Sequence, residues 1–118
     1  MILFLGVIYH VEDVFGCVKL LHSLLEPGGS IYIETHVTNI QASVPIFEYA
    51  SDTHPTSAPQ GRGTLRTVGL SNYLLPNVLA MENLAQSYDF AFTHLNGSAN
   101  VYSRESPLRQ VFRFDKKM

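Results

Sequence analysis

Charged residues are scarce in this chain of 118 residues. Asp, Glu, Lys and Arg make up 15% of it, and 8 Lys and Arg stand against 10 Asp and Glu, for a formal net charge of −2. Because cations are few and form no basic stripe, the composition argues against strong phosphate-driven binding of nucleic acid. The low share of charge also suggests that part of the surface meets a partner.

Cysteine and membrane-spanning signals are scarce too. The single cysteine, Cys17, excludes an intramolecular disulfide and fits a reducing compartment, so we expect a cytoplasmic protein. The apolar start, residues 1–8, lacks a positive leader and is far too short to span a bilayer. It therefore predicts a buried strand and no membrane contact. With no internal repeat, the length predicts one domain, 1–118.

The first third of the sequence predicts a βαβ unit. Residues 2–8 (ILFLGVI) form a continuous apolar run, typical of a strand buried on both faces of a parallel sheet. Residues 13–25 carry one apolar stripe at helical spacing, with Asp13 as a candidate N-cap. The turn Pro27-Gly28-Gly29 ends the helix, and 30–37 form the next strand, which should lie parallel to the first.

The rest of the chain predicts a long irregular segment followed by a helix and two strands. Residues 39–71 are rich in Pro and Gly without a sustained period, which is typical of a lid or insertion loop. Residues 77–88 predict a helix with Asn77 as a candidate N-cap. Alternation in 90–95 and β-forming residues in 108–115 predict two strands. The fold class is therefore α/β.

Four pieces in order carry a resemblance to a known family. They are Phe4-Leu5-Gly6-Val7-Ile8-Tyr9-His10, Leu25-Glu26-Pro27-Gly28-Gly29, Ile33-Glu34-Thr35 and Asn72-Tyr73-Leu74-Leu75-Pro76-Asn77. The chain resembles the C-terminal half of class I S-adenosylmethionine-dependent methyltransferases. It is most similar to the branch with the tRNA wobble-uridine 5-oxyacetic acid carboxymethyltransferases.

The resemblance implies half of a Rossmann-like sheet, with strands in the order 4-5-7-6 and the last strand antiparallel. The first half, which holds the glycine-rich cofactor loop of the family, has no counterpart here. Gly61-Arg62-Gly63 is the nearest glycine motif, but it lies in the Pro-rich segment and not between a strand and a helix. Without that half, residues 2–8 become an exposed apolar edge, and we expect either homo-oligomers through this strand or a chain that needs the other half.

The resemblance also implies site residues at the carboxyl ends of the strands, where α/β sheets bind ligands. Tyr9, His10 and Glu34 are the candidate catalytic residues. Three structural alternatives remain open: Tyr9 packs under the lid, His10 caps the loop, and Glu34 makes a structural hydrogen bond to a neighbouring loop. The cofactor would be S-adenosylmethionine or its carboxylated form. Its candidate binding residues are Leu5, Gly6, Tyr9 and Arg109.

Further candidates are less specific. Arg109 lies in an Arg-x-Val context that reaches the cofactor's extra carboxylate in the carboxymethyl-transferring branch, but a solvated arginine at a strand edge remains open. Tyr73 and Asn77 are candidate substrate-binding residues, with a plain helix cap as the alternative for Asn77. His36, Asp52 and His54 have metal-ligand types, but their order resembles no zinc spacing, so we expect no metal.

The expected function is methyl transfer by a parent enzyme whose acceptor is unknown, with this chain inactive alone. One alternative is a fragment of a tRNA wobble-uridine (carboxy)methyltransferase, with tRNA as a partner. The other is a non-catalytic interaction domain that kept the half-fold. Chemistry of this type depends mainly on positioning of donor and acceptor, so few dedicated catalytic residues are expected.

Overall fold

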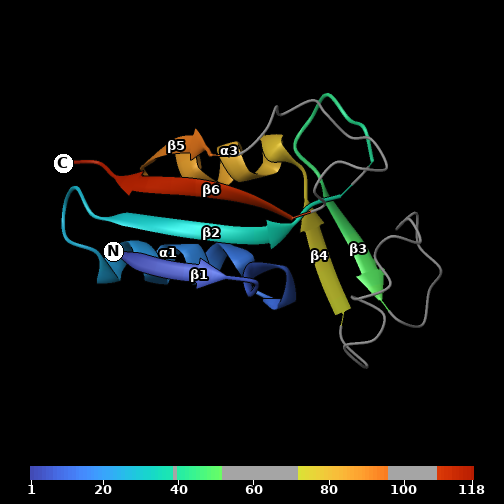
Figure 1. The fold of residues 1–118 in the computed structure, drawn as a ribbon, viewed down its shortest axis with the longest axis horizontal. Coiled ribbons are helices and arrows are strands. Elements are labelled where there is room, and N and C mark those ends of the chain that lie inside the picture. The colour runs from blue at the N-terminus through green and yellow to red at the C-terminus, as the bar shows by residue number, and fades with distance from the viewer. Residues whose placement is uncertain (39, 52–71, 96–108) are drawn as a thin grey trace.

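The computed structural model describes residues 1–38, 40–51, 72–95 and 109–118 (Figure 1). The predicted helices and strands at 13–25, 30–37, 77–88, 90–95 and 108–115 are confirmed to within one residue at each end. The elements, in chain order, are β1 (Ile2–Leu5), a 3-10 turn (Ile8–His10), α1 (Val14–Leu24), β2 (Ser30–His36), β3 (Phe47–Ser51), β4 (Asn72–Pro76), α3 (Val78–Ser87), β5 (Phe90–His94) and β6 (Arg109–Lys116).

The first strand is shorter than predicted. A strand over 2–8 was expected, but β1 ends at Leu5 and the chain turns through a 3-10 turn at Ile8–His10. Gly6 ends the strand because its φ is +69°, a conformation that glycine adopts without the steric cost of a side chain. The Gly6 N–H still donates to the Glu34 carbonyl at 2.8 Å, so the turn stays anchored to β2.

A mixed sheet of four strands has the order β1-β2-β6-β5. β1 and β2 are parallel, as the βαβ pattern predicted. β6 runs antiparallel to both of its neighbours, β2 and β5. The α/β class, this strand order and the antiparallel last strand are therefore confirmed, and β1 lies at an edge of the sheet, as expected.

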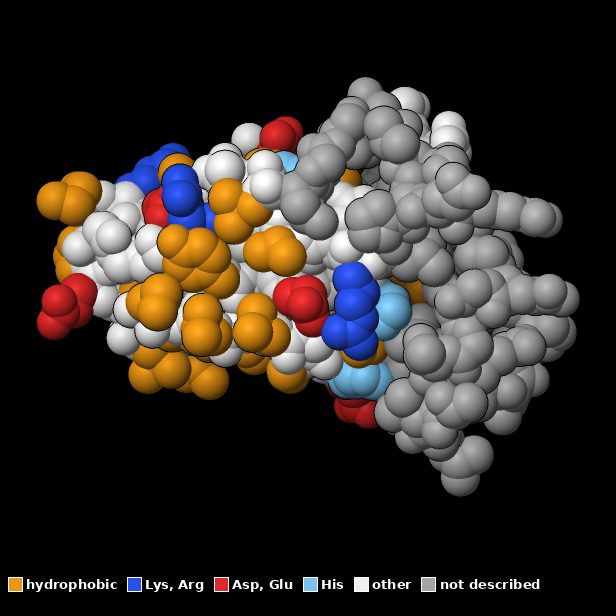
Figure 2. Space-filling view, viewed as in Figure 1, with side chains coloured by type: hydrophobic (Ala, Val, Ile, Leu, Met, Phe, Trp, Pro, Cys, Tyr) orange, Lys and Arg blue, Asp and Glu red, His pale blue; other side chains and the backbone are white. Residues whose placement is uncertain are grey.

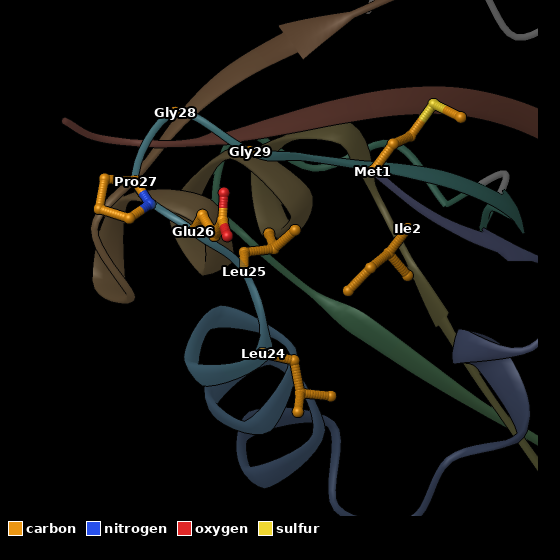
Figure 3. Close-up of a pocket in the computed structure, with 8 residues that line it drawn as sticks. All are labelled: Met1, Ile2, Leu24, Leu25, Glu26, Pro27, Gly28 and Gly29. Atoms are coloured by element: carbon orange, nitrogen blue, oxygen red, sulfur yellow. The ribbon is translucent and has the colours of Figure 1, made fainter.

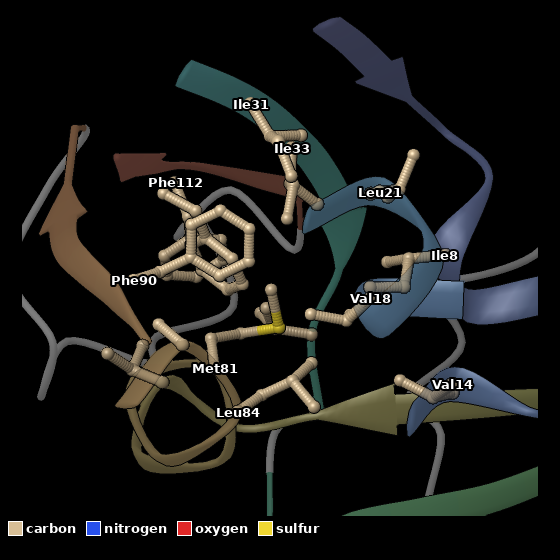
Figure 4. Close-up of a cluster of buried hydrophobic side chains, with 14 of the residues drawn as sticks. Ile8, Val14, Val18, Leu21, Ile31, Ile33, Met81, Leu84, Phe90 and Phe112 are labelled. Atoms are coloured by element: carbon tan, nitrogen blue, oxygen red, sulfur yellow. The ribbon is translucent and has the colours of Figure 1, made fainter. Parts of the chain in front are cut away.

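Both helices cover the same face of the sheet. The core joins Val18 and Leu21 of α1 and Met81 of α3 to alternate residues of β2 and β6, such as Ile33 and Phe112 (Figure 4). Because side chains alternate along a strand, the intervening residues face the other way. The prediction that the first strand is buried on both faces was wrong, because no helix among the described residues covers that second face, where Leu3 and Leu5 are exposed.

A second sheet of two strands was not expected. β3 pairs antiparallel with β4, from Phe47 opposite Pro76 to Ser51 opposite Asn72. Figure 1 shows this sheet beyond the end of the main sheet toward which β2 points. Part of the predicted irregular segment 39–71 is thus a strand; residues 39 and 52–71 lie outside the described residues.

Asn77 fixes the junction between the second sheet and α3. Its side-chain oxygen accepts from the N–H of Ala80 at 2.8 Å, which caps the helix as predicted, and from the N–H of Ile46 at 3.1 Å. Its amide donates to the carbonyl of Val44 at 2.9 Å. Asp13 caps α1 more simply, since its carboxylate accepts from the N–H of Gly16.

In the described parts of the chain, neither helix has the length and apolar character needed to cross a membrane.

We predict that the two caps differ in their contribution to stability. Asp13→Ala removes one capping bond and should lower the free energy of unfolding by about 1 kcal/mol. Asn77→Ala also removes the bonds to 44 and 46 within a buried site, so its loss should be about 2 kcal/mol or more. Urea unfolding measures both values. Equal losses would show that Asn77 acts as a cap alone.

Candidate functional site

Polar side chains gather where β1 and β2 end. Because parallel strands present their carboxyl ends at one edge, the turn after β1 and the last residues of β2 lie together. β6 runs the opposite way, so its first residue, Arg109, pairs with His36 at the same edge. Five residues form what we call the strand-end cluster: Gly6, Tyr9, Glu34, His36 and Arg109.

Arg109 links two residues of β2. Its Nη1 donates to Glu34 Oε1 at 2.8 Å, and its Nε donates to His36 Nε2 at 3.1 Å. The second bond requires a lone pair on His36 Nε2, so this geometry belongs to the neutral imidazole. The Arg109 side chain is 50% exposed and that of Glu34 is 31% exposed, so the ion pair is open to solvent and to a ligand.

The 3-10 turn brings Tyr9 and His10 to the cluster. Tyr9 is buried, with its ring edge-on to His36 at 4.9 Å between centroids and tilted against His10 at 4.3 Å. Partial burial lowers the pKa of His10 from its ordinary value of 6.5. The neutral imidazole therefore dominates at pH 7, which is the form that accepts a proton.

Gly6 leaves room at the centre of the cluster. A Cβ built on Gly6 would lie 3.9 Å from Arg109 Nη1, 3.9 Å from Glu34 Oε1 and 4.0 Å from the Tyr9 hydroxyl. Three polar atoms from three elements thus surround one point beside a bare backbone. Such an arrangement permits a ligand to approach the main chain while it meets a cation, a carboxylate and a phenol.

The other predicted site residues lie around the cluster or apart from it. Leu5 pairs with Glu34 across the two strands and borders the cluster. β4, which carries Tyr73, packs against the 3-10 turn, although the side chain of Tyr73 lies outside the described part. Asn77 is buried, and its hydrogen bonds go to the cap and to the adjoining segment.

His36 belongs to the cluster, although the sequence did not predict it there. In the sequence it stood out only by its metal-ligand type, together with Asp52 and His54, which lie outside the described residues. Residues two apart on a strand point to the same face, so the pattern Glu34-Thr35-His36 carried the signal. Within the described ranges, no three His, Cys, Asp or Glu side chains are grouped as metal ligands.

Cys17 has no part in the cluster. It lies on α1 and packs partly buried against the core. Burial, with the nearby Asp13 carboxylate as a second cause, raises the pKa of the Cys17 thiol. The thiol therefore stays protonated near neutral pH and is a poor nucleophile.

A hollow of about 400 Å³ opens at the other end of β1 (Figure 3). Met1 and Ile2 line it at the start of β1, Leu24 and Leu25 at the end of α1, and residues 26–29 from the following turn. It is the amino end of the strand that borders this hollow, so the hollow and the strand-end cluster are separate features.

Comparison with known proteins gave no assignment: no family model and no curated protein matches the chain.

We predict a weak coupling between Glu34 and Arg109. A double-mutant cycle of Glu34→Ala and Arg109→Ala should give a coupling energy of about 0.2–1 kcal/mol, because a half-exposed ion pair is well solvated. Urea unfolding of the four proteins provides the value. The control cycle joins Glu34 with Arg113, whose carboxylate partner is Asp115; it should show no coupling. Equal coupling in both cycles would contradict a specific pair.

Proposed function

We propose that this chain is part of an S-adenosylmethionine-dependent methyltransferase and supplies one wall of its active site. The observation that carries the proposal is the order β1-β2-β6-β5 with β6 antiparallel, since the sequence resemblance implies this order for the second half of such a sheet. The strand-end cluster supports it, because it lies at the carboxyl ends of the two parallel strands, where this architecture binds ligands.

The chain offers residues suited to only part of S-adenosylmethionine. The bare backbone at Gly6, surrounded by Tyr9, Glu34 and Arg109, suits a ligand that must approach the main chain. The glycine-rich loop between a strand and a helix, which resembling enzymes use for the rest of the cofactor, has no counterpart in this sequence. When bound, S-adenosylmethionine supplies an activated methyl group.

The roles of the residues follow from their positions. Tyr9, held by His36 and His10, sets the shape of the site with little freedom to move. Glu34, fixed by Arg109, can accept a hydrogen bond from an incoming hydroxyl or amine and so orient it. Neutral His10, at the rim, can accept the proton that such a group releases.

The geometry favours methyl over carboxymethyl transfer. A carboxylated cofactor needs an arginine free to hold its extra carboxylate, but Arg109 Nη1 already binds Glu34 Oε1 at 2.8 Å. The extra carboxylate would have to displace Glu34 or lie beside it, and two adjacent carboxylates repel each other. A tRNA acceptor is a lesser candidate because this chain is short of cations.

Titration of the ¹⁵N-labelled chain with S-adenosylhomocysteine, followed by NMR, tests the proposal. We expect weak, millimolar binding, because only one wall of the site is present, with shifts confined to the amides of Gly6, Tyr9, Glu34 and their neighbours. Arg109→Ala should weaken this binding several-fold. Arg113→Ala is the matched control, since Arg113 lies on the same strand and face but pairs with Asp115, and it should leave the binding unchanged.

Two results would overturn the proposal. One is the absence of shifts at the strand-end cluster at millimolar ligand. The other is an equal effect of the two arginine variants, which would reduce the interaction to general charge attraction. Either result would favour the alternative of a non-catalytic interaction domain.

A further inference from the structure

The β1 edge of the main sheet lacks the residues that usually prevent pairing with another strand. Between Met1 and Val11 there is no Asp, Glu, Lys, Arg or Pro, although charges and prolines are what proteins use to prevent pairing at an exposed edge. The opposite edge, β5, follows Asp89 and carries Thr93 and His94. α3 also packs against β5. β1 is therefore an edge that carries no charge or proline along its whole length.

Apolar side chains extend from β1 onto the flank of α1. Met1, Leu3, Leu5 and Val7, with Leu20 and Leu24 of α1, are between 41% and 80% exposed. Leu20 and Leu24 are four residues apart and so share one side of the helix. Leu24 borders the same hollow as Met1 and Ile2, which places this flank beside β1. We call these six residues the β1 edge surface.

Figure 2 looks onto the face of the main sheet that neither α1 nor α3 covers. Hydrophobic side chains gather there over β1 and the neighbouring strand, and the charged and histidine side chains of the strand-end cluster lie at one end of this apolar area. On this face, the apolar area runs along β1 and carries little charge.

We propose that the β1 edge surface binds the same surface of a second copy of this chain. In such a dimer β1 pairs antiparallel with the partner's β1, and the two sheets become one. A two-fold axis perpendicular to the sheet keeps both α1 helices on the same face, so that Leu20 and Leu24 meet their counterparts. The contact is isologous and closes at two copies.

The pattern of β1 is complementary to itself. Residues directly opposite in an antiparallel pair lie on the same face of the sheet. Leu3 and Leu5 point to the open face, while Ile2 and Phe4 pack against the core. In any register that places odd-numbered residues opposite odd-numbered ones, apolar side chains therefore meet apolar side chains on both faces of the sheet. No like charges lie opposite each other.

Much of the surface of these six residues is available for contact, since their exposed fractions run from 41% to 80%. A standard interface buries about 800 Å² per partner, and the backbone of β1 and the lining of the hollow add to the side-chain area.

This dimer is proposed for the chain by itself, because in the complete sheet that the resemblance implies the first half would pair with the same edge of β1. Because the paired β1 strands run in opposite directions, the two strand-end clusters lie at opposite ends of the joined strands. Neither cluster supplies residues to the other, so dimer formation and ligand binding can fail separately.

Size-exclusion chromatography with light scattering tests the dimer at micromolar concentration. The wild-type chain should have twice the monomer mass. Leu3→Lys places a charge on the exposed side of β1 and should give the monomer mass. Leu20→Lys places a charge on the part of the contact formed by α1, leaves the strand unchanged, and should also give the monomer mass. Leu79→Lys is the matched control, since Leu79 is an exposed leucine on α3, and it should stay dimeric.

Circular dichroism confirms that each variant is folded, and if Leu3→Lys unfolds, Leu20→Lys decides. A monomeric wild-type chain would overturn the proposal and would mean that the β1 edge does not pair with a second copy. Dimers that persist in both lysine variants would overturn it as well. Open-ended aggregates of the wild type would contradict a contact that closes at two copies.

Discussion

The rest of the structure depends on the insertion of β6 between β2 and β5. β6 pairs with β2 over seven consecutive positions, from Ser30 opposite Asp115 to His36 opposite Arg109, and with β5 over five. A strand from the end of the chain thereby occupies the middle of the sheet, and Phe112 and Phe114 complete the core beneath α1 and α3. The same register sets Arg109 against Glu34 and His36. The core and the strand-end cluster therefore have a common cause.

Local signals in the sequence were enough for most helices and strands. Apolar spacing and the caps Asp13 and Asn77 marked the two helices, and β-branched and aromatic residues marked β2, β5 and β6. The end of β1 was missed, because nothing in the sequence distinguishes a glycine in a strand from one at φ +69°. β3 was missed because its partner β4 follows a long intervening segment, and a strand whose pairing is non-local leaves only a weak local pattern.

The sequence named most residues of the strand-end cluster, but it did not predict the contacts between them. Tyr9 and Glu34 were named from the ends of their strands and the family resemblance, and Arg109 was named from the resemblance alone. The structure brings the three side chains together around Gly6. The bond from Arg109 to His36 depends on the register between β2 and β6, which a single sequence does not specify. That bond, with the edge-on contact of His36 to Tyr9, explains why a rigid polar cluster forms beside a largely apolar surface. The open face and edge of β1 place the cluster at one end of a surface suited to another chain.

Amide hydrogen exchange, followed residue by residue in β6, tests the central place of this strand. In a central strand successive N–H groups donate alternately to the two neighbours, so all the consecutive amides from Phe112 to Asp115 should exchange slowly. In an edge strand only every second amide is bonded. Slow exchange along the whole run is the result that the structure predicts. Alternating slow and fast amides would place β6 at an edge, and the pairing on which both the core and the cluster depend would be wrong.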